Sequence, residues 1–166
     1  MRKFRSFAFA SAFVAASLLP AQSASAAGEP QFVNAADIKW GNPPPGLPQQ
    51  AKFAVLMGDP GKEGPFVVRL KMPAGYKVPA HWHSIDEIVT VISGTLYLGM
   101  GDKLDESQGH ELKAGGFHSI AAKTHHYAYS KKGAVVQVHG SGPFDIHYIN
   151  PDDDPSKPKD SAAKSQ

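Results

Sequence analysis

The stretch GYKVPAHWHSIDEIVTVISG, from Gly75 to Gly94, brings two histidines and a glutamate together in a segment with the character of β-strands. His81 and His83 are separated by one residue, and side chains two residues apart in a β-strand share a face. Glu87 follows four residues after His83. Two imidazoles and a carboxylate that converge suit a divalent transition metal. The stretch therefore predicts part of a metal site.

The segments around this stretch predict an all-β fold. They are short runs of aliphatic, aromatic and β-branched residues separated by Gly, Pro, Asn and Asp, and no segment has a helical period. The runs are KFAVLMG, PFVVRLKM, KVPAHWH, EIVTVIS, TLYLGM, HELKA, GFHSIAA, HHYAYS, AVVQVHG and FDIHYIN. Their spacing is typical of a β-sandwich or barrel. Ser93 and Gly94, between two alternating runs, predict a hairpin turn.

The first 26 residues have the pattern of a secretory signal peptide. Arg2, Lys3 and Arg5 precede the apolar run SFAFASAFVAASLLP, and small residues at Ala24 and Ala26 match a cleavage site. An uncleaved membrane anchor is the alternative, but the run is shorter than the roughly 20 apolar residues that a spanning helix needs. We expect cleavage near Ala26, a periplasmic or secreted protein, and no membrane contact after cleavage.

The remaining composition excludes several classes of function. Residues 1–26 carry three of the 17 basic residues and none of the 15 acidic ones, so the rest of the chain is near neutral. No basic run remains that would indicate binding to nucleic acid or to an anionic membrane. The chain has no cysteine, which excludes disulfides, thiol catalysis and thiolate metal sites. Stability must come from the core and from a bound metal or a partner subunit.

The length of 166 residues and the absence of a fixed repeat predict one domain. We expect the barrel over residues 51–150. Residues 27–50 contain a proline cluster and predict an extended arm on the surface, docked by Trp40. Residues 151–166 have no apolar side chain larger than alanine, apart from proline, and predict a disordered tail.

The quoted stretch resembles the first signature motif of the cupin superfamily. It has Gly75, five residues, His81-x-His83, three residues, Glu87, six residues and Gly94. The run LKAGGFHSIAAKTHHYAYS resembles the second motif. Gly115-Gly116 match its turn, Ala121 and Lys123 stand where Pro and Gly are usual, and His126 falls on the histidine position.

This resemblance covers roughly residues 51–150 and is nearest to small secreted single-domain bacterial cupins of the cupin-2 type. It implies a double-stranded β-helix, the jelly-roll or cupin barrel, with an extended N-terminal arm. It also implies that His81, His83, Glu87 and His126 hold one metal ion inside the barrel. His125 competes with His126, because adjacent strand residues face opposite ways and spacing alone does not decide between them.

The predicted ligands also limit the choice of metal. Three imidazoles and one carboxylate fit Fe, Zn, Mn, Ni or Cu. With six-coordinate geometry, two positions would remain for water, substrate or dioxygen. Export in an unfolded state would leave metal loading outside the cytoplasm, where the affinity order favours Cu and Zn over Fe and Mn.

Other residues are candidates for roles beside the metal. His118 and Tyr127 are candidates to move a proton during catalysis. His139 and His147 lie in β-type runs and either line the cavity or serve the structure. Arg69 interrupts the apolar run FVVRL and either anchors an anionic substrate or lies on the surface between core valines.

The resemblance allows several activities, because cupins include dioxygenases, isomerases, epimerases, decarboxylases and proteins that only bind a ligand. We expect a metal-dependent enzyme on a small organic molecule, using dioxygen with iron or a metal Lewis acid. The alternative is a non-catalytic cupin that binds a metal or a small ligand. A metal sealed by Met100 and Phe117 would contradict the enzyme. A homodimer formed through sheets and arms is compatible with the sequence.

Overall fold

The computed structural model describes residues 31–157; the expected signal peptide and residues 158–166 of the expected tail lie outside the described residues. Within residues 31–157 the strands are β1 (Lys52–Met57), β2 (Gly64–Met72), β3 (Tyr76–Trp82), β4 (Glu87–Met100), β5 (His110–Lys113), β6 (Phe117–Ile120), β7 (His126–Ser130), β8 (Ala134–Gly142) and β9 (His147–Tyr148). Two short 3₁₀ helices, η1 (Ala35–Asp37) and η2 (Pro151–Asp153), flank them. None of the helices in these residues has the length and apolarity to cross a membrane.

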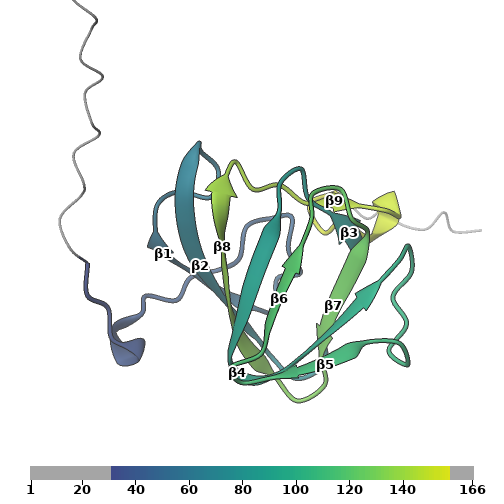
Figure 1. Ribbon diagram of the computed structural model, residues 1–166, viewed down its shortest axis with the longest axis horizontal. Helices are drawn as coiled ribbons and strands as arrows, with labels where there is room; N and C mark the ends of the chain where they lie inside the picture. Colours follow the sequence, from purple (N-terminus) through teal and green to yellow (C-terminus); the bar gives the residue numbers. More distant parts are fainter. Residues whose placement is uncertain (1–30, 158–166) are drawn as a thin grey trace, which may run out of the picture. The chain divides into compact units, whose positions relative to one another are not determined.

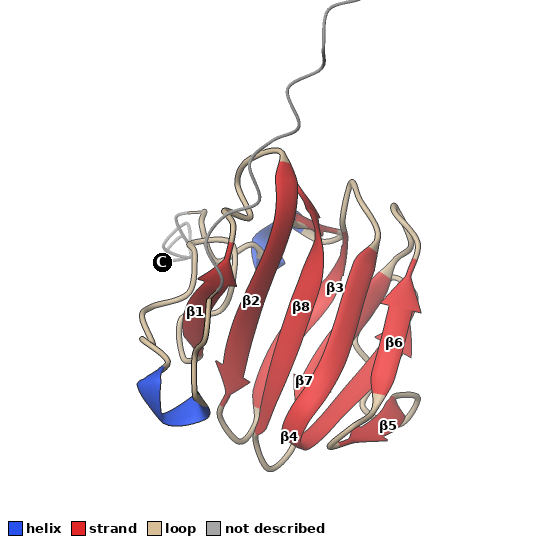
Figure 2. Ribbon diagram, turned by 60° about the vertical axis from the view of Figure 1, so that its left-hand side comes forward, coloured by secondary structure: helices blue, strands red, loops and turns tan. Residues whose placement is uncertain are grey.

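The strands form two antiparallel sheets that share β4. One sheet has the order β1-β2-β8-β4-β6, and the other has the order β5-β4-β7-β3-β9. Figure 2 shows β1, β2 and β8 side by side, and Figure 1 shows how β4 runs from one sheet into the other. This arrangement is a jelly-roll barrel, as the sequence predicted.

Strand β4 corrects the expected hairpin. The runs EIVTVIS and TLYLGM form one strand, Glu87–Met100, instead of two strands joined by a turn. Its pairing with β8 shifts register between Val91 and Ser93. Gly94 has a φ of 73°, and a Cβ there would lie 2.2 Å from the carbonyl oxygen of Gly133. Glycine therefore allows a bulge that bends the strand from one sheet into the other.

The barrel interior is filled by alternate residues of its strands. Along β2, Phe66, Val68, Leu70 and Met72 are buried. Each such side chain contributes about 1.5–3 kcal/mol when it is fully removed from water. Arg69 lies between them on the opposite face, and its Nε donates to Gln137 Oε1 on β8 at 3.1 Å. Of its two interpretations, the surface position is therefore confirmed.

The arm is part of the barrel wall rather than a purely surface segment. Gly41 pairs with Phe53 of β1. Leu47 then packs against the buried core, where the sequence predicted only surface contacts. Lys71 places its Nζ 5.9 Å from the centre of the Trp40 ring. The proline-rich composition indicated an extended backbone, but it did not indicate that one leucine would turn inward.

The start of the expected disordered tail is also ordered. Residues 151–157 contain η2, where the Asn150 side chain accepts from the amide of Asp152 at 3.3 Å. The Asp154 side chain accepts from the amide and hydroxyl of Ser156 at 2.9 and 2.6 Å. These local side-chain caps hold a polar segment that has no apolar side chain to bury.

Candidate metal centre

Three histidines converge inside the barrel and form what we call the histidine cluster: His81, His83 and His126. His81 on β3 and His126 on β7 face each other across the paired strands. His83 lies just beyond the end of β3 and, two residues from His81, faces the same way. The three side chains are buried, and one ring nitrogen of each lies within 4.8 Å of the other two. The cluster has the size and donor chemistry of a transition-metal site.

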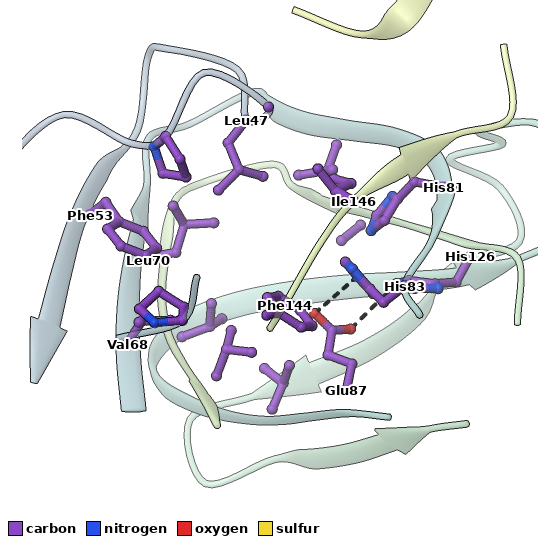
Figure 3. A pocket seen from close by; sticks show the side chains of 18 of the residues that line it. Leu47, Phe53, Val68, Leu70, His81, His83, Glu87, His126, Phe144 and Ile146 are labelled. Carbon is purple, nitrogen blue, oxygen red and sulfur yellow. Dashed lines mark ion pairs between the residues drawn. The ribbon is translucent and has the colours of Figure 1, made fainter. Parts of the chain in front are cut away.

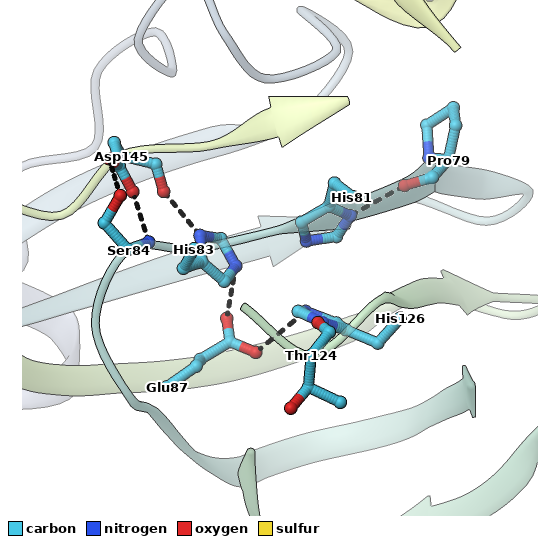
Figure 4. A network of polar contacts seen from close by, with 8 residues as sticks. All are labelled: Pro79, His81, His83, Ser84, Glu87, Thr124, His126 and Asp145. Carbon is cyan, nitrogen blue, oxygen red and sulfur yellow. Dashed lines mark hydrogen bonds and ion pairs between the residues drawn. The ribbon is translucent and has the colours of Figure 1, made fainter. Parts of the chain in front are cut away.

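Each ring of the cluster donates its Nδ1 proton to a main-chain carbonyl oxygen (Figure 4). The pairs are His81 with Pro79 at 2.6 Å, His83 with Asp145 at 2.5 Å and His126 with Thr124 at 2.9 Å. A carbonyl oxygen only accepts, so each Nδ1 must carry the proton. Each Nε2 then keeps a free lone pair, which is the arrangement that metal-ligating histidines adopt.

Glu87, the first residue of β4, approaches the cluster from a third strand. Its carboxylate oxygens lie 3.6 Å from His83 Nε2 and 3.4 Å from His126 Nε2, which is longer than a good hydrogen bond. Among the described residues, both nitrogens are buried without a hydrogen-bond partner. Such orphaned polar atoms cost free energy, and a cation between the imidazoles and the carboxylate would satisfy them. The residues therefore fit a divalent transition metal.

The electrostatics of the site favour the metal-binding protonation state in three of its four groups, His81, His83 and Glu87. Burial, followed by the nearby rings of His126 and His83, lowers the pKa of His81 to about 3. Burial also lowers the pKa of His83. Burial acts to lower the pKa of His126 too, but contact with Glu87 outweighs it and raises this pKa. For Glu87, burial acts to raise the pKa, but contact with His126 and the field of His83 hold it at about 2. At neutral pH a charged carboxylate thus lies beside the neutral rings of His81 and His83, while its contact with His126 favours the protonated form of that ring, whose proton a metal would replace.

The turn before β7 selects which of two adjacent histidines enters the barrel. Lys123, where the cupin resemblance expects glycine, has a φ of 63°, in the left-handed region that glycine tolerates best. Its amide donates to the carbonyl of His83 at 2.8 Å, and the amide of Ala122 donates to Asp86 Oδ1 at 2.8 Å. The turn is therefore tied to the segment that carries His83, and His126 faces inward.

The other histidines lie outside the cluster. His125 points to Asp102, with its Nδ1 2.6 Å from a carboxylate oxygen. His147 is exposed and stacks on Trp82, with ring centroids 4.0 Å apart. His139 does not line the cavity beside the cluster, although its Nδ1 is buried and has no partner among the described residues. These three histidines therefore provide no ligand atom to the cluster.

The two side chains predicted to move protons lie in different places. His118 on β6 lines the cavity beside the cluster, and its Nδ1 is buried without a partner among residues 31–157. Burial lowers the pKa of His118, and the charge of Glu87 offsets this only in part. Tyr127 follows His126 on β7, so it faces the other side, where its hydroxyl donates to the carbonyl of Asp105 at 2.9 Å. The expected catalytic role of Tyr127 is corrected to a packing role, because its side chain does not reach the cavity.

Asp145, between β8 and β9, is a site residue that the sequence did not reveal. Its main-chain oxygen accepts from His83, and its carboxylate accepts from the amide and hydroxyl of Ser84 at 2.7 and 2.6 Å. The neighbouring Phe144 stacks on the His83 ring, with centroids 4.3 Å apart. A separation of 62 residues hides this contact from any local pattern. The one available signal was an acidic residue inside the run FDIHYIN.

The cluster forms one end of a cavity of about 320 Å³ inside the barrel. Most of the lining is aliphatic or aromatic, and Leu47 and Phe53 lie on the side opposite His126 (Figure 3). Met100 and Phe117 are 51% and 57% exposed and do not line the cavity, so they do not seal the cluster. The site therefore combines a metal-binding end with space for an organic molecule.

Residues 26–147 match the family model described as Domain of unknown function (DUF4437). The chain belongs to the DUF4437 family. A comparison of this DUF4437 chain with curated proteins finds no match.

Solved structures similar to this DUF4437 chain share its fold. The polyketide cyclase RemF from Streptomyces resistomycificus is 17% identical, with a TM-score of 0.62 over 76% of this chain and 89% of that one. A candidate acetylacetone dioxygenase from Methylibium petroleiphilum is 16% identical, with a TM-score of 0.59 over 79% and 88%. An RmlC-like cupin from Shewanella frigidimarina is 16% identical, with a TM-score of 0.53 over 68% and 91%. At these identities the likeness concerns the fold, which is that of the cupin superfamily.

Proposed function

We propose that this protein is a metal-dependent enzyme acting on a small organic molecule, with His81, His83, His126 and Glu87 as ligands of one divalent transition metal. The observation that carries the proposal is the shared orientation of the three histidines, whose Nδ1 atoms all donate to main-chain carbonyl groups. Three Nε2 lone pairs and one carboxylate are then available to Fe, Zn, Mn, Ni or Cu. A bound metal would supply Lewis-acid activation of a substrate oxygen or, if it is redox-active, chemistry with dioxygen.

The chain itself supplies a pocket and a proton acceptor. The cavity of about 320 Å³ adjoins the cluster, so a substrate bound there is surrounded by apolar walls that exclude water. His118 lines this cavity and its pKa is lowered, so the ring is neutral at neutral pH. A neutral imidazole with an unpartnered nitrogen can accept a proton from a substrate held at the metal.

The cavity favours an enzyme over the alternative of a protein that only captures a metal. A storage site needs its ligands and a closed shell, whereas an enzyme needs open space beside the metal and a titratable group within reach. Two of the proteins with this fold also have enzymatic descriptions, a polyketide cyclase and a candidate dioxygenase. These names support an enzyme in general and do not indicate which reaction this chain performs.

The proposal is tested by the metal content of the purified protein beside three histidine variants. We expect about one equivalent of a transition metal in the wild type and in His125→Ala, and almost none in His81→Ala. His118→Gln should keep the metal. Fe or Mn would direct a substrate screen by oxygen uptake with phenols and ketones, and Zn, Cu or Ni would direct it to Lewis-acid reactions. Equal metal content in wild type and His81→Ala, or no metal after reconstitution, would overturn the proposal.

A further inference from the structure

The cavity divides sharply into a polar end and an apolar end. Within the described lining, side chains that can form hydrogen bonds belong only to the histidine cluster and to His118, Glu87 and Asp145. The carboxylate of Asp145 already accepts two hydrogen bonds from Ser84. The described lining contains no Lys or Arg. A ligand in this cavity therefore meets polar partners at one end only, and any charge at its other end would be buried without a partner.

The volume of the cavity limits the size of that ligand. A cavity of about 150 Å³ lined by aliphatic and aromatic side chains accepts benzene, which has six non-hydrogen atoms. The cavity here measures about 320 Å³. By this proportion it accepts roughly a dozen non-hydrogen atoms, equivalent to two fused rings or a medium-length alkyl chain.

Leu47 of the arm is held rigidly in the apolar wall. The carbonyl oxygens of the residues on either side of it, Gly46 and Pro48, accept from the hydroxyls of Tyr148 and Tyr76, each at 2.8 Å. A Cβ at Gly46 would lie 2.9 Å from Ile146 Cγ2, so a larger residue there would have to displace the Ile146 side chain. Both flanking peptides are therefore held in place, and the main chain at Leu47 cannot move away from a longer ligand without breaking a tyrosine hydrogen bond.

From this arrangement we propose that the cavity takes an uncharged molecule with one metal-chelating end and an apolar body of roughly ten atoms, and that Leu47 sets its maximum length. The proposal rests on the metal-dependent function proposed above. The chelating end lies at the histidine cluster, and the body extends along the barrel toward Leu47 and Phe53 (Figure 3). Sugars, polyols and molecules with a second charged group are excluded, because the apolar end offers their polar groups no partner.

The test uses straight-chain alkyl hydroxamic acids of two to fourteen carbons, titrated calorimetrically into zinc-reconstituted full-length protein. Zinc is chosen because it does not react with dioxygen. Affinity should rise about three- to fourfold for each added methylene and then stop rising when the tail reaches Leu47. Leu47→Ala should move this limit to a longer chain by one or two carbons, and Leu47→Phe should shorten it. Affinity that does not depend on chain length, or a limit that no Leu47 variant moves, would overturn the proposal.

Two controls give this test its specificity. Leu104 is half-buried like Leu47 but does not line the cavity, so Leu104→Ala should leave the length limit unchanged. 6-Aminohexanehydroxamic acid should bind at least tenfold more weakly than the uncharged six-carbon probe, because its ammonium group would be buried without a partner. Equal binding of these two probes would contradict an apolar cavity end.

Primary amides of the same chain lengths separate this inference from the proposed metal function. They lack the chelating group, so they report the apolar cavity without depending on the metal. If hydroxamates gain nothing over amides when zinc is present, the metal function and the chelating end fail, while the chain-length limit of the amides still decides whether Leu47 limits the length of an apolar ligand. If hydroxamates gain from zinc but neither series has a limit near Leu47, the metal function stands and the inference fails.

Discussion

The two ends of the cavity are built on opposite principles. At the metal end, polar side chains are buried, and their protons are donated to the carbonyl groups of Pro79, Asp145 and Thr124. At the other end, aliphatic and aromatic side chains face the same space with no polar partner. The apolar end stabilises the fold by removing surface from water, whereas the metal end contains buried polar atoms that only a bound cation would satisfy. The metal end is therefore built for binding at the expense of the stability of the metal-free fold.

The largest effect that we predict is a loss of folding stability at acidic pH, caused by the buried histidines at the metal end. Burial lowers the pKa of His81 to about 3 and also lowers those of His83 and His118, from a normal value of 6.5. Below pH 6.5 these rings become protonated in the unfolded chain but stay neutral in the folded protein. The free energy of unfolding is therefore fully present above pH 6.5 and decreases as the pH falls. The loss is at most about 1.4 kcal/mol per pH unit for each ring. The pKa of His126 is raised, so this ring gains stability from protonation and opposes the trend. It is a single ring, whereas three rings have a lowered pKa. The urea midpoint of metal-free protein should fall steeply between pH 6.5 and 4.5.

Two variants test whether the buried rings cause the effect. His118→Gln removes one of them outside the histidine cluster and should make the pH dependence shallower. His110 is exposed on β5, so His110→Gln should leave the dependence unchanged. A urea midpoint that stays constant between pH 7 and 5 would show that the rings titrate normally, and the contrast between the two ends would lose its electrostatic basis.

A hydroxyl placed at the apolar end should reduce stability by a smaller amount. Val136 is 4% exposed and lines the cavity, while the preceding residue Val135 is half-buried on the other face of β8. Val136→Thr keeps the side-chain shape but buries a hydroxyl without a partner, which costs about 1–3 kcal/mol. Val135→Thr should change the free energy of unfolding by less than about 0.5 kcal/mol. The measurement is urea unfolding of both variants at neutral pH.

An equal and small cost for the two threonine variants would contradict the division of the cavity. It would mean that ordered water at the apolar end provides the hydrogen bonds for the new hydroxyl. The length limit proposed for apolar ligands would then need another explanation, because displacing ordered water from a polar surface does not reward each added methylene equally.

The metal end was largely predictable from the sequence because its information is local. His81, His83 and Glu87 lie within one short stretch, and the two-residue period of a strand is enough to align the histidines. The barrel itself followed from short β-type runs together with this motif. The choice between His125 and His126 was not local, because it depends on a turn that Lys123 makes in a left-handed conformation. Lysine, unlike glycine or asparagine, gives no indication of such a conformation in a sequence.

The apolar end and the outer shell of the site could not be predicted, because they depend on contacts between distant segments. Leu47 lies in a proline-rich arm whose composition indicated a surface position, and the hydrogen bonds from Tyr76 and Tyr148 to its neighbours come from segments far away in the sequence. The hairpin predicted at Gly94 was wrong because glycine occurs in β-bulges as well as in turns, and here it forms a bulge. Tyr127 was misplaced because its direction depends on which of two adjacent histidines faces the barrel.

The smallest effect that we predict is a loss of zinc affinity on substitution of Asp145, which lies between the histidine cluster and the outer surface. Its carboxylate fixes Ser84, the residue after His83, and its main-chain oxygen accepts from the His83 ring. Asp145→Ala keeps the main-chain acceptor but loses the carboxylate, so the ring becomes less well oriented and zinc affinity should fall about tenfold. Asp102→Ala is the matched control, because Asp102 pairs with the outward-facing His125 at 2.6 Å and should leave zinc affinity unchanged. Zinc competition titrations measure both, and equal affinities in the two variants would mean that Phe144 stacking and the main-chain bond alone orient His83.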